Sequence, residues 1–195
     1  MEGQIQQAQA QASQTEALER ALGLRATVKA ATLVARVIAG DASPGSLTVT
    51  IDRGATDGVQ PDMAVIGPGG VVGRVINRPS PHAAQVQLII ARTAAVAVAF
   101  ERSGAGGVAV GGNGNPPLRV EYVPDASDVK VGDRAVTTGQ DGLFPQGFVV
   151  GTVERAERRA GVWTIGMRPA VDFSHIDVVL VVLDKLARSD AAASP

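Results

Sequence analysis

Two histidines are the side chains of this protein best suited to acid–base chemistry, and their neighbours decide which reaction is possible. Hydrolysis by a serine nucleophile needs a serine, a histidine and a carboxylate in one site. His82 follows a proline in a predicted loop, whereas His175 precedes the last predicted strand. The chain has no G-x-S-x-G sequence, and neither Ser46 nor Ser103 stands in a predicted oxyanion turn. We therefore interpret both histidines as exposed or capping residues, with a chymotrypsin-like hydrolase as an alternative.

The carboxylates around His175 raise a second possibility, which is a metal site. Asp172, His175 and Asp177 have an i, i+3, i+5 spacing that suits a loop. Loops that bind calcium or magnesium supply more oxygen ligands than this, so we interpret Asp172 as the cap of a turn. The glycine stretches at 67–70 and 104–107 lack the spacing and the following helix of a phosphate-binding loop. The residues thus predict no catalytic site, no metal and no cofactor.

The composition excludes several further classes of protein. The 195 residues include no cysteine, which excludes disulfide scaffolds, thiolate zinc sites and cysteine nucleophiles. Hydrophobic residues make up 45% of the chain, which is too many for a disordered one. The formal net charge of −1 gives no overall field that would steer nucleic acid to the surface. We therefore expect a folded protein that does not bind nucleic acid.

One basic cluster lies near the end of the chain, at Arg155, Arg158 and Arg159. Glu154 and Glu157 interleave with these arginines, and no aromatic residue lies beside them for base stacking. We interpret the cluster as the solvated face of a hairpin. Its basic side chains could also contact an acidic partner surface.

The start of the chain has the composition of a helix. Residues Gln4–Lys29 are rich in glutamine, alanine and glutamate and contain no proline. Leu18 and Leu22 belong to an apolar stripe that is otherwise mostly alanine and follows the heptad imperfectly. Two interpretations stay open, a frayed helix or linker and the distal end of a longer coiled coil. The N-terminus has no apolar run typical of a signal peptide, and no segment has the roughly 18 apolar residues of a membrane span.

Beyond Ala30 the apolar residues recur with a period of two, which is the pattern of half-buried strands. The predicted strands cover Ala31–Ala39, Leu47–Ile51, Met63–Ile66, Val71–Ile76, Gln85–Ile90, Val96–Phe100, Val108–Val110, Leu118–Val123, Arg134–Thr137, Gly147–Arg155, Val162–Met167 and Asp177–Leu183. Since Val178–Leu183 is apolar on both faces, we expect it to be a central strand. The fold class is mainly β, with two small β-barrel subdomains preceded by an N-terminal helix.

An internal repeat supports two related units. The block from Asp62 to Val75 resembles the block from Asp133 to Val153, with Asp62 and Asp133 separated by 71 positions. Each block is a tight turn, a strand, a glycine-rich loop and a second strand. We expect a helical segment at 1–30, a first barrel at 31–113, a second at 114–185 and a flexible tail at 186–195, and strands can cross between the barrels.

Glycine and proline are abundant, and aromatic residues are only 3% of the chain. We expect the turns and bends of the barrels at Gly54, Gly58, Gly70, Gly73, Gly107, Pro145, Gly147 and Gly151. With few aromatic side chains, the cores must be filled by valine, isoleucine, leucine and alanine. The aromatic residues that we expect to be exposed for a partner are Tyr122, Phe144, Phe148 and Trp163.

Ordered segments along most of the chain resemble the rod shape-determining MreC family of bacteria. They are Thr50–Val59, Met63–Val65, Gly69–Val75, Arg102–Gly111, Glu121–Pro124, Val131–Asp133, Thr138–Gly139, Gly142–Gly147, Val150–Val153 and Asp172–Ser174. Each segment alone is typical of any turn, but their combined order from about Leu33 to Leu183 is specific to this family. The resemblance implies a periplasmic two-barrel domain that follows a membrane helix and a coiled coil.

The resemblance also implies a function without catalytic residues. Members of the family are scaffolds of the wall-elongation machinery that self-associate and associate with MreD, RodA and a class B penicillin-binding transpeptidase. We therefore expect a periplasmic protein that is anchored to the inner membrane by a segment absent from this chain, with homo-oligomers as a further expectation. A soluble cytoplasmic protein and a periplasmic adaptor of an export system are alternatives, although the adaptor needs a second helix that returns along the first.

Overall fold

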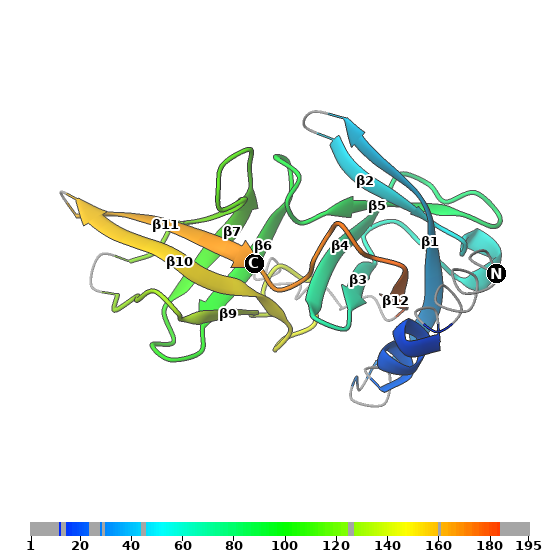
Figure 1. Ribbon diagram of the computed structural model, residues 1–195, viewed down its shortest axis with the longest axis horizontal. Coiled ribbons are helices and arrows are strands. Elements are labelled where there is room, and N and C mark those ends of the chain that lie inside the picture. The colour runs from blue at the N-terminus through cyan, green and yellow to red at the C-terminus, as the bar shows by residue number, and fades with distance from the viewer. Residues whose placement is uncertain are drawn as a thin grey trace, which may run out of the picture.

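Two closed antiparallel barrels of six strands each make up most of the molecule (Figure 1). The computed structural model describes residues 12, 15–23, 28, 30–43, 46–124, 127–159 and 161–183. Residues 15–23 form a helix that lies beside the first barrel. The predicted fold class, mainly β with two small barrels after an N-terminal helix, is confirmed. In the part of the chain described here, no helix is both long and apolar enough to cross a membrane.

The strands follow the predicted segments closely. The first barrel contains β1 (Thr32–Ser43), β2 (Ser46–Ile51), β3 (Ala64–Gly67), β4 (Gly70–Ile76), β5 (Ala84–Leu88) and β12 (Val178–Val182). The second contains β6 (Ala95–Phe100), β7 (Gly106–Gly111), β8 (Leu118–Glu121), β9 (Arg134–Thr137), β10 (Val149–Arg159) and β11 (Val162–Pro169). A short 3₁₀ helix, η1 (Ala55–Asp57), precedes β3.

The second barrel is inserted between two strands of the first. Around the first barrel the order is β1-β12-β3-β4-β5-β2, and around the second it is β10-β11-β8-β7-β6-β9. Six consecutive strands, β6 to β11, therefore form the second barrel, and the last strand, β12, returns to complete the first barrel beside β1 and β3. The expected boundary between 113 and 114 differs from this division, because β6 and β7 lie in the second barrel and β12 lies in the first. Alternation of apolar residues shows which face of a strand is buried but not which barrel it enters.

The internal repeat corresponds to matching hydrogen bonds in the two barrels. The N–H of Asp62 bonds to the carbonyl of Val75 and the N–H of Val75 bonds to Met63, both at 2.9 Å. In the second barrel, Gly132 and Asp133 make the same two bonds with Val153, at 2.8 and 2.9 Å. Asp133 thus matches Met63 rather than Asp62, which shifts the expected repeat by one residue.

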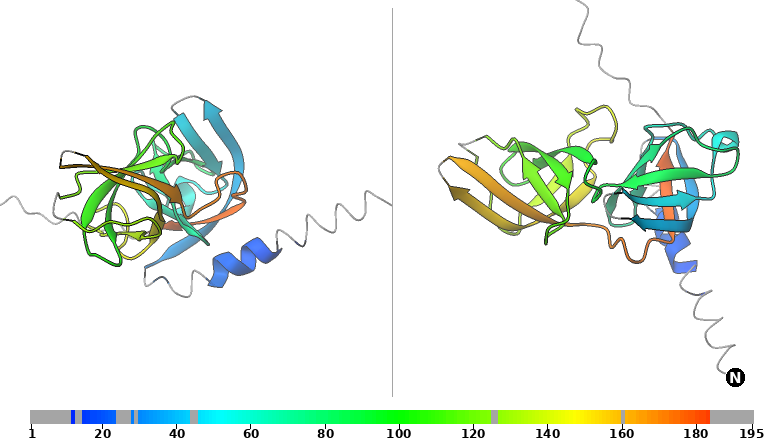
Figure 2. Two further views of the ribbon diagram at one scale, coloured as in Figure 1. Left: turned by 60° about the vertical axis from the view of Figure 1, so that its left-hand side comes forward. Right: turned by 90° about the horizontal axis from the view of Figure 1, so that it is seen from above.

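Close contacts between backbones determine how the barrels meet. Gly70 has a φ of 148°, and a Cβ there would lie 2.1 Å from the carbonyl oxygen of Val149 in the second barrel. On the other chain connection, a Cβ at Gly111 would lie 2.1 Å from the carbonyl oxygen of Ala91. No L side chain fits at either distance, so glycine permits the close approach of the two barrels seen from above in Figure 2.

The eight predicted turn and bend positions serve two purposes in the fold. Three glycines have left-handed or otherwise positive φ angles, namely Gly58, Gly70 and Gly147. Besides Gly70, four lie where a Cβ would collide with another segment, namely Gly54, Gly73, Gly107 and Gly151. The carbonyl of Pro145 accepts a hydrogen bond from the Thr137 hydroxyl. The glycine content therefore reflects close packing of backbones as much as tight turns.

The last strand packs on both of its faces, as its sequence predicts. Val179 and Val181 belong to the core of the first barrel. Val178, Leu180 and Val182 belong instead to the second apolar cluster, which includes Ala21 of the helix and the interior of the second barrel. The helix thus covers the outer side of the first barrel and gives β12 its second apolar neighbour (Figure 1).

Only part of the predicted Gln4–Lys29 helix can be compared with the structure. Residues 1–11 lie outside the described residues, as do 13–14, 24–27 and 29 and the predicted tail at 186–195. Ala21 is fully buried, whereas Leu18 and Leu22 are 37% and 47% exposed. The described turns of the helix therefore pack on the barrel through alanine and leave their leucines toward solvent.

We expect Gly70→Ala to lower the free energy of unfolding by about 2 kcal/mol or more, because the methyl group cannot fit against Val149 and the φ angle disfavours it. Urea unfolding measures this change. Gly106→Ala is the matched control, since Gly106 also begins a strand but its Cβ would have no neighbour closer than 3.9 Å. The control should change stability by less than about 1 kcal/mol. Equal effects of the two variants would contradict this account of the junction.

Candidate partner-binding surface

The end of the second barrel that points away from the first has exposed apolar side chains. Its parts are the turn at 101–105, the loop residues 122–124 and 127–133, and the ends of β10 and β11 near Arg159 and Val162, which we call the distal end (Figure 1). Tyr122, Val131 and Val162 lie there with exposed fractions of 82%, 66% and 68%. Large apolar side chains at such exposure are typical contacts for a partner.

The four aromatic residues expected at a partner surface lie in different environments. Tyr122 is exposed, as expected. Phe148 and Trp163 are half-buried against the apolar cluster of the second barrel. Phe144 is only 2% exposed and belongs to that core, so its proposed role as an exposed contact is wrong. Its ring fills space in a barrel with few other large side chains.

A left-handed backbone conformation presents Tyr122 to solvent. β8 ends at Glu121, and Tyr122 follows with a φ of 60°, which is uncommon for an aromatic residue. The chain then returns to the barrel, where Val123 packs over Gly107 of β7. A Cβ at Gly107 would lie 3.0 Å from the Val123 side chain, so the small residue in β7 makes room for this return.

An arginine connects two parts of the distal end. Arg102, in the turn after β6, donates to both carboxylate oxygens of Asp133 at 2.7 and 2.8 Å. Its Nη1 also donates to Asp128 at 2.6 Å. Asp133 is nearly buried and accepts a further hydrogen bond from the N–H of Lys130 at 2.8 Å. These bonds hold the loop that contains Val131 against the turn.

The same bonds determine the charge state of the loop. Hydrogen bonds from Arg102 lower the pKa of Asp133 and of Asp128 below their ordinary values, while partial desolvation opposes the shift. The carboxylates raise the pKa of Arg102 in return. Both aspartates are therefore ionised at neutral pH, and the loop keeps its ion pairs there.

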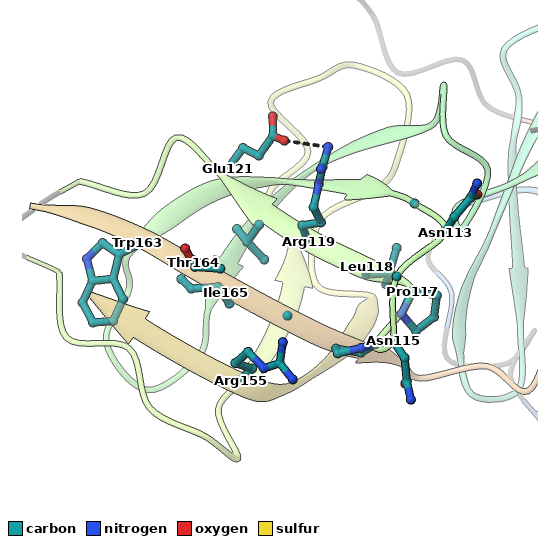
Figure 3. Close-up of a pocket in the computed structure, with 15 residues that line it drawn as sticks. Asn113, Asn115, Pro117, Leu118, Arg119, Glu121, Arg155, Trp163, Thr164 and Ile165 are labelled. Carbon is teal, nitrogen blue, oxygen red and sulfur yellow. Dashed lines mark ion pairs between the residues drawn. The ribbon is translucent and has the colours of Figure 1, made fainter. Parts of the chain in front are cut away.

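A groove runs along the outer face of the second barrel toward the distal end (Figure 3). Its volume is about 380 Å³, and its floor is β11 at Thr164 and Gly166. The loop at 112–117 closes one end of the groove. Its Pro116 lies so near Gly166 that a Cβ on Gly166 would come within 2.7 Å of the proline ring. Trp163 lies at the other end, with its indole Nε1 buried and without a hydrogen-bond partner in the described part of the chain.

Charged side chains stand on both sides of this groove. Arg119 of β8 pairs with Glu121 at 2.9 Å on one side. Arg155 of β10 points over the floor from the other side and makes no ion pair with any described residue. Arg155 belonged to the basic cluster expected from the sequence, but the groove beside it was not predicted. Its walls come from strands that are far apart in the chain, so no local pattern indicates them.

The histidines make local contacts. His175 Nδ1 lies 2.9 Å from Asp172, whose other carboxylate oxygen accepts the N–H of Ser174 at 2.9 Å. His175 and Ser174 hydrogen bonds lower the pKa of Asp172. His82 Nδ1 lies 3.3 Å from the Thr56 hydroxyl, and neither histidine bonds to the hydroxyl of a described serine. Among the described residues, no three His, Asp or Glu side chains are grouped as a metal site would need.

The geometry describes a tandem β-barrel protein whose most exposed apolar residues and open groove lie on the second barrel. A family model described as "Rod shape-determining protein MreC, barrel core" matches residues 37–183. The chain belongs to the MreC family, which confirms the resemblance found in the sequence.

Relatives and solved structures agree with this assignment. The cell shape-determining protein MreC of Escherichia coli is 30% identical over 77% of this chain and 41% of its own length. That of Listeria monocytogenes is 31% identical over 77% of this chain and 52% of its own length. The chain thus spans about half the length of these relatives.

Among solved structures, one MreC chain has a TM-score of 0.81 and 32% identity over 89% of this chain and 99% of its own length. MreC of Pseudomonas aeruginosa has a TM-score of 0.73 and 30% identity over 78% of this chain and 99% of its own. The MreC of a Helicobacter pylori complex with the penicillin-binding protein PBP2 covers 79% of this chain and 100% of its own, and at 14% identity and a TM-score of 0.61 it shows the shared fold alone.

We expect Arg102→Met to flatten the acid dependence of stability. A carboxylate whose pKa is lowered by folding stabilises the protein above its unfolded pKa, and that contribution is lost as the pH falls through its folded pKa. Wild-type stability should therefore fall steeply below about pH 4, and the variant should be less stable at neutral pH and fall less steeply.

Urea unfolding from pH 7 to pH 3 measures this difference. Arg134→Met is the control, because Arg134 forms its ion pair with the exposed Glu101 at a longer distance of 3.6 Å. An acid dependence in Arg102→Met as steep as in the wild type would contradict the role given to these ion pairs.

Proposed function

We propose that this chain is the periplasmic scaffold region of a cell-wall elongation protein without catalytic activity of its own. Its two barrels bind a class B penicillin-binding transpeptidase and stabilise the active conformation of that enzyme, which is a shift of population by binding. The observation that carries the proposal is the family membership together with the exposed apolar distal end. The complex of PBP2 with MreC from Helicobacter pylori, which shares this fold, supports the choice of partner.

The proposal includes self-association and a membrane anchor. Relatives about twice as long as this chain leave room for an inner-membrane segment and for contacts with MreD and RodA outside it. Leu18 and Leu22 are one helical turn apart and both exposed, which suits pairing with a second helix. Solved structures of the same fold are described as the periplasmic domain of a cell shape-determining filament, which supports assembly of several copies.

We expect this chain to bind the periplasmic region of its cognate class B transpeptidase with a dissociation constant of about 10 µM or lower. Tyr122→Asn should weaken binding about tenfold or more, because it removes the most exposed aromatic side chain. Asparagine tolerates the left-handed conformation, so the melting temperature should not fall. Isothermal titration calorimetry and a thermal scan measure the two quantities.

Ile38→Thr is the control, because Ile38 is 61% exposed but lies on the first barrel. The affinity of Ile38→Thr for the transpeptidase should match that of the wild type. Absence of binding at about 50 µM protein would contradict the proposed function. Undiminished binding by Tyr122→Asn would exclude the distal end as the contact while leaving the function in place.

A further inference from the structure

The groove on the second barrel ends at a strand edge that has no neighbour among the residues that the structure describes. β8 pairs with β11 only at Leu118, Arg119 and Val120, opposite Met167, Gly166 and Ile165. Glu121 still pairs with β7, and the left-handed turn at Tyr122 then takes the chain away from β11. Within the described residues, Val162–Thr164 of β11 therefore pairs only with β10, and we call this segment the open edge.

An open edge binds extended peptide segments. Its unpaired N–H and C=O groups can form a new antiparallel or parallel ladder with an incoming strand, and proteins usually protect such edges. Here the hairpin of β10 and β11 runs beyond the barrel into solvent (Figure 1), and Val162 is 68% exposed. Only a peptide backbone matches the donor and acceptor spacing of a strand edge, so the geometry favours a protein segment as the occupant.

The charges beside the open edge indicate what such a segment carries. Arg119 is neutralised by Glu121, and Arg168 on the same outer face pairs with Glu154 at 3.3 Å. Arg155 is therefore the guanidinium at the groove without a carboxylate among the described residues. Thr164 lines the same floor (Figure 3), two residues along β11 from Gly166, which lies opposite Arg155. A carboxylate placed above this floor would accept hydrogen bonds from both side chains.

We propose that the groove and the open edge bind an extended, acidic segment of the partner protein, which adds a strand beside Val162–Thr164 and places a carboxylate on Arg155. This inference rests on the proposed function, since the partner is the same transpeptidase. It goes further because it assigns the contact to backbone pairing and one ion pair on the outer face, rather than to exposed apolar side chains alone.

The test compares groove variants in binding to the periplasmic region of the cognate transpeptidase. Arg155→Glu should weaken binding about tenfold or more, and Arg155→Lys should retain part of the affinity because it keeps the charge. Thr164→Trp fills the floor with an exposed side chain and should also weaken binding. Arg78→Glu is the matched control, because Arg78 is an exposed arginine of the first barrel with the same change of charge.

Hydrogen exchange separates strand addition from a purely electrostatic contact. Amides of 162–164 should become protected in the complex and should stay unprotected when the chain alone is concentrated. Binding that is unchanged by Arg155→Glu and leaves these amides exposed would overturn this inference and leave the proposed function in place. Protection that develops with the concentration of the chain alone would show a second copy as the occupant and would also overturn it. Absence of any binding would overturn both.

Discussion

The return of β12 to the first barrel is the constraint on which the rest of the structure depends. β12 follows the whole second barrel in the chain, so the first barrel needs both ends of the described chain to form its full set of ladders. Backbone contacts at Gly70 and Gly111 bring the barrels together where the chain crosses between them. The apolar cluster of the second barrel continues through this junction to the outer side of β12 and to Ala21 of the helix. The return of β12 and the continuous packing together make one body from two similar units.

That single body separates two kinds of surface. The helix packs on the first barrel, while Tyr122, the Arg102 ion pairs and the groove beside Arg155 lie on the second (Figure 1). A partner held at the distal end would leave the exposed leucines of the helix accessible for assembly. A scaffold needs this separation, because it must hold its partner and its own copies without competition between the two contacts.

The sequence predicted the fold well because both of its main signals are local. Alternating apolar residues located the strands, and the two apolar faces of Val178–Leu183 predicted a strand packed on both sides. It did not predict that β6 and β7 belong to the second barrel and β12 to the first, since pairing between distant strands leaves no local pattern. Phe144 was expected at the surface because aromatic residues are rare in the chain, but its ring belongs to the core. The groove beside Arg155 was missed for the same reason as the return of β12, because its walls come from β8, β10 and β11 and from the loop at 112–117.

Calorimetric unfolding tests the central claim of a single body most directly. A structure in which the second barrel is inserted between β5 and β12 of the first, with an apolar cluster that continues from one barrel to the other, should unfold in one transition, with a calorimetric enthalpy equal to the van't Hoff enthalpy. Two separate transitions, or a calorimetric enthalpy about twice the van't Hoff value, would show barrels that unfold independently and would contradict the account.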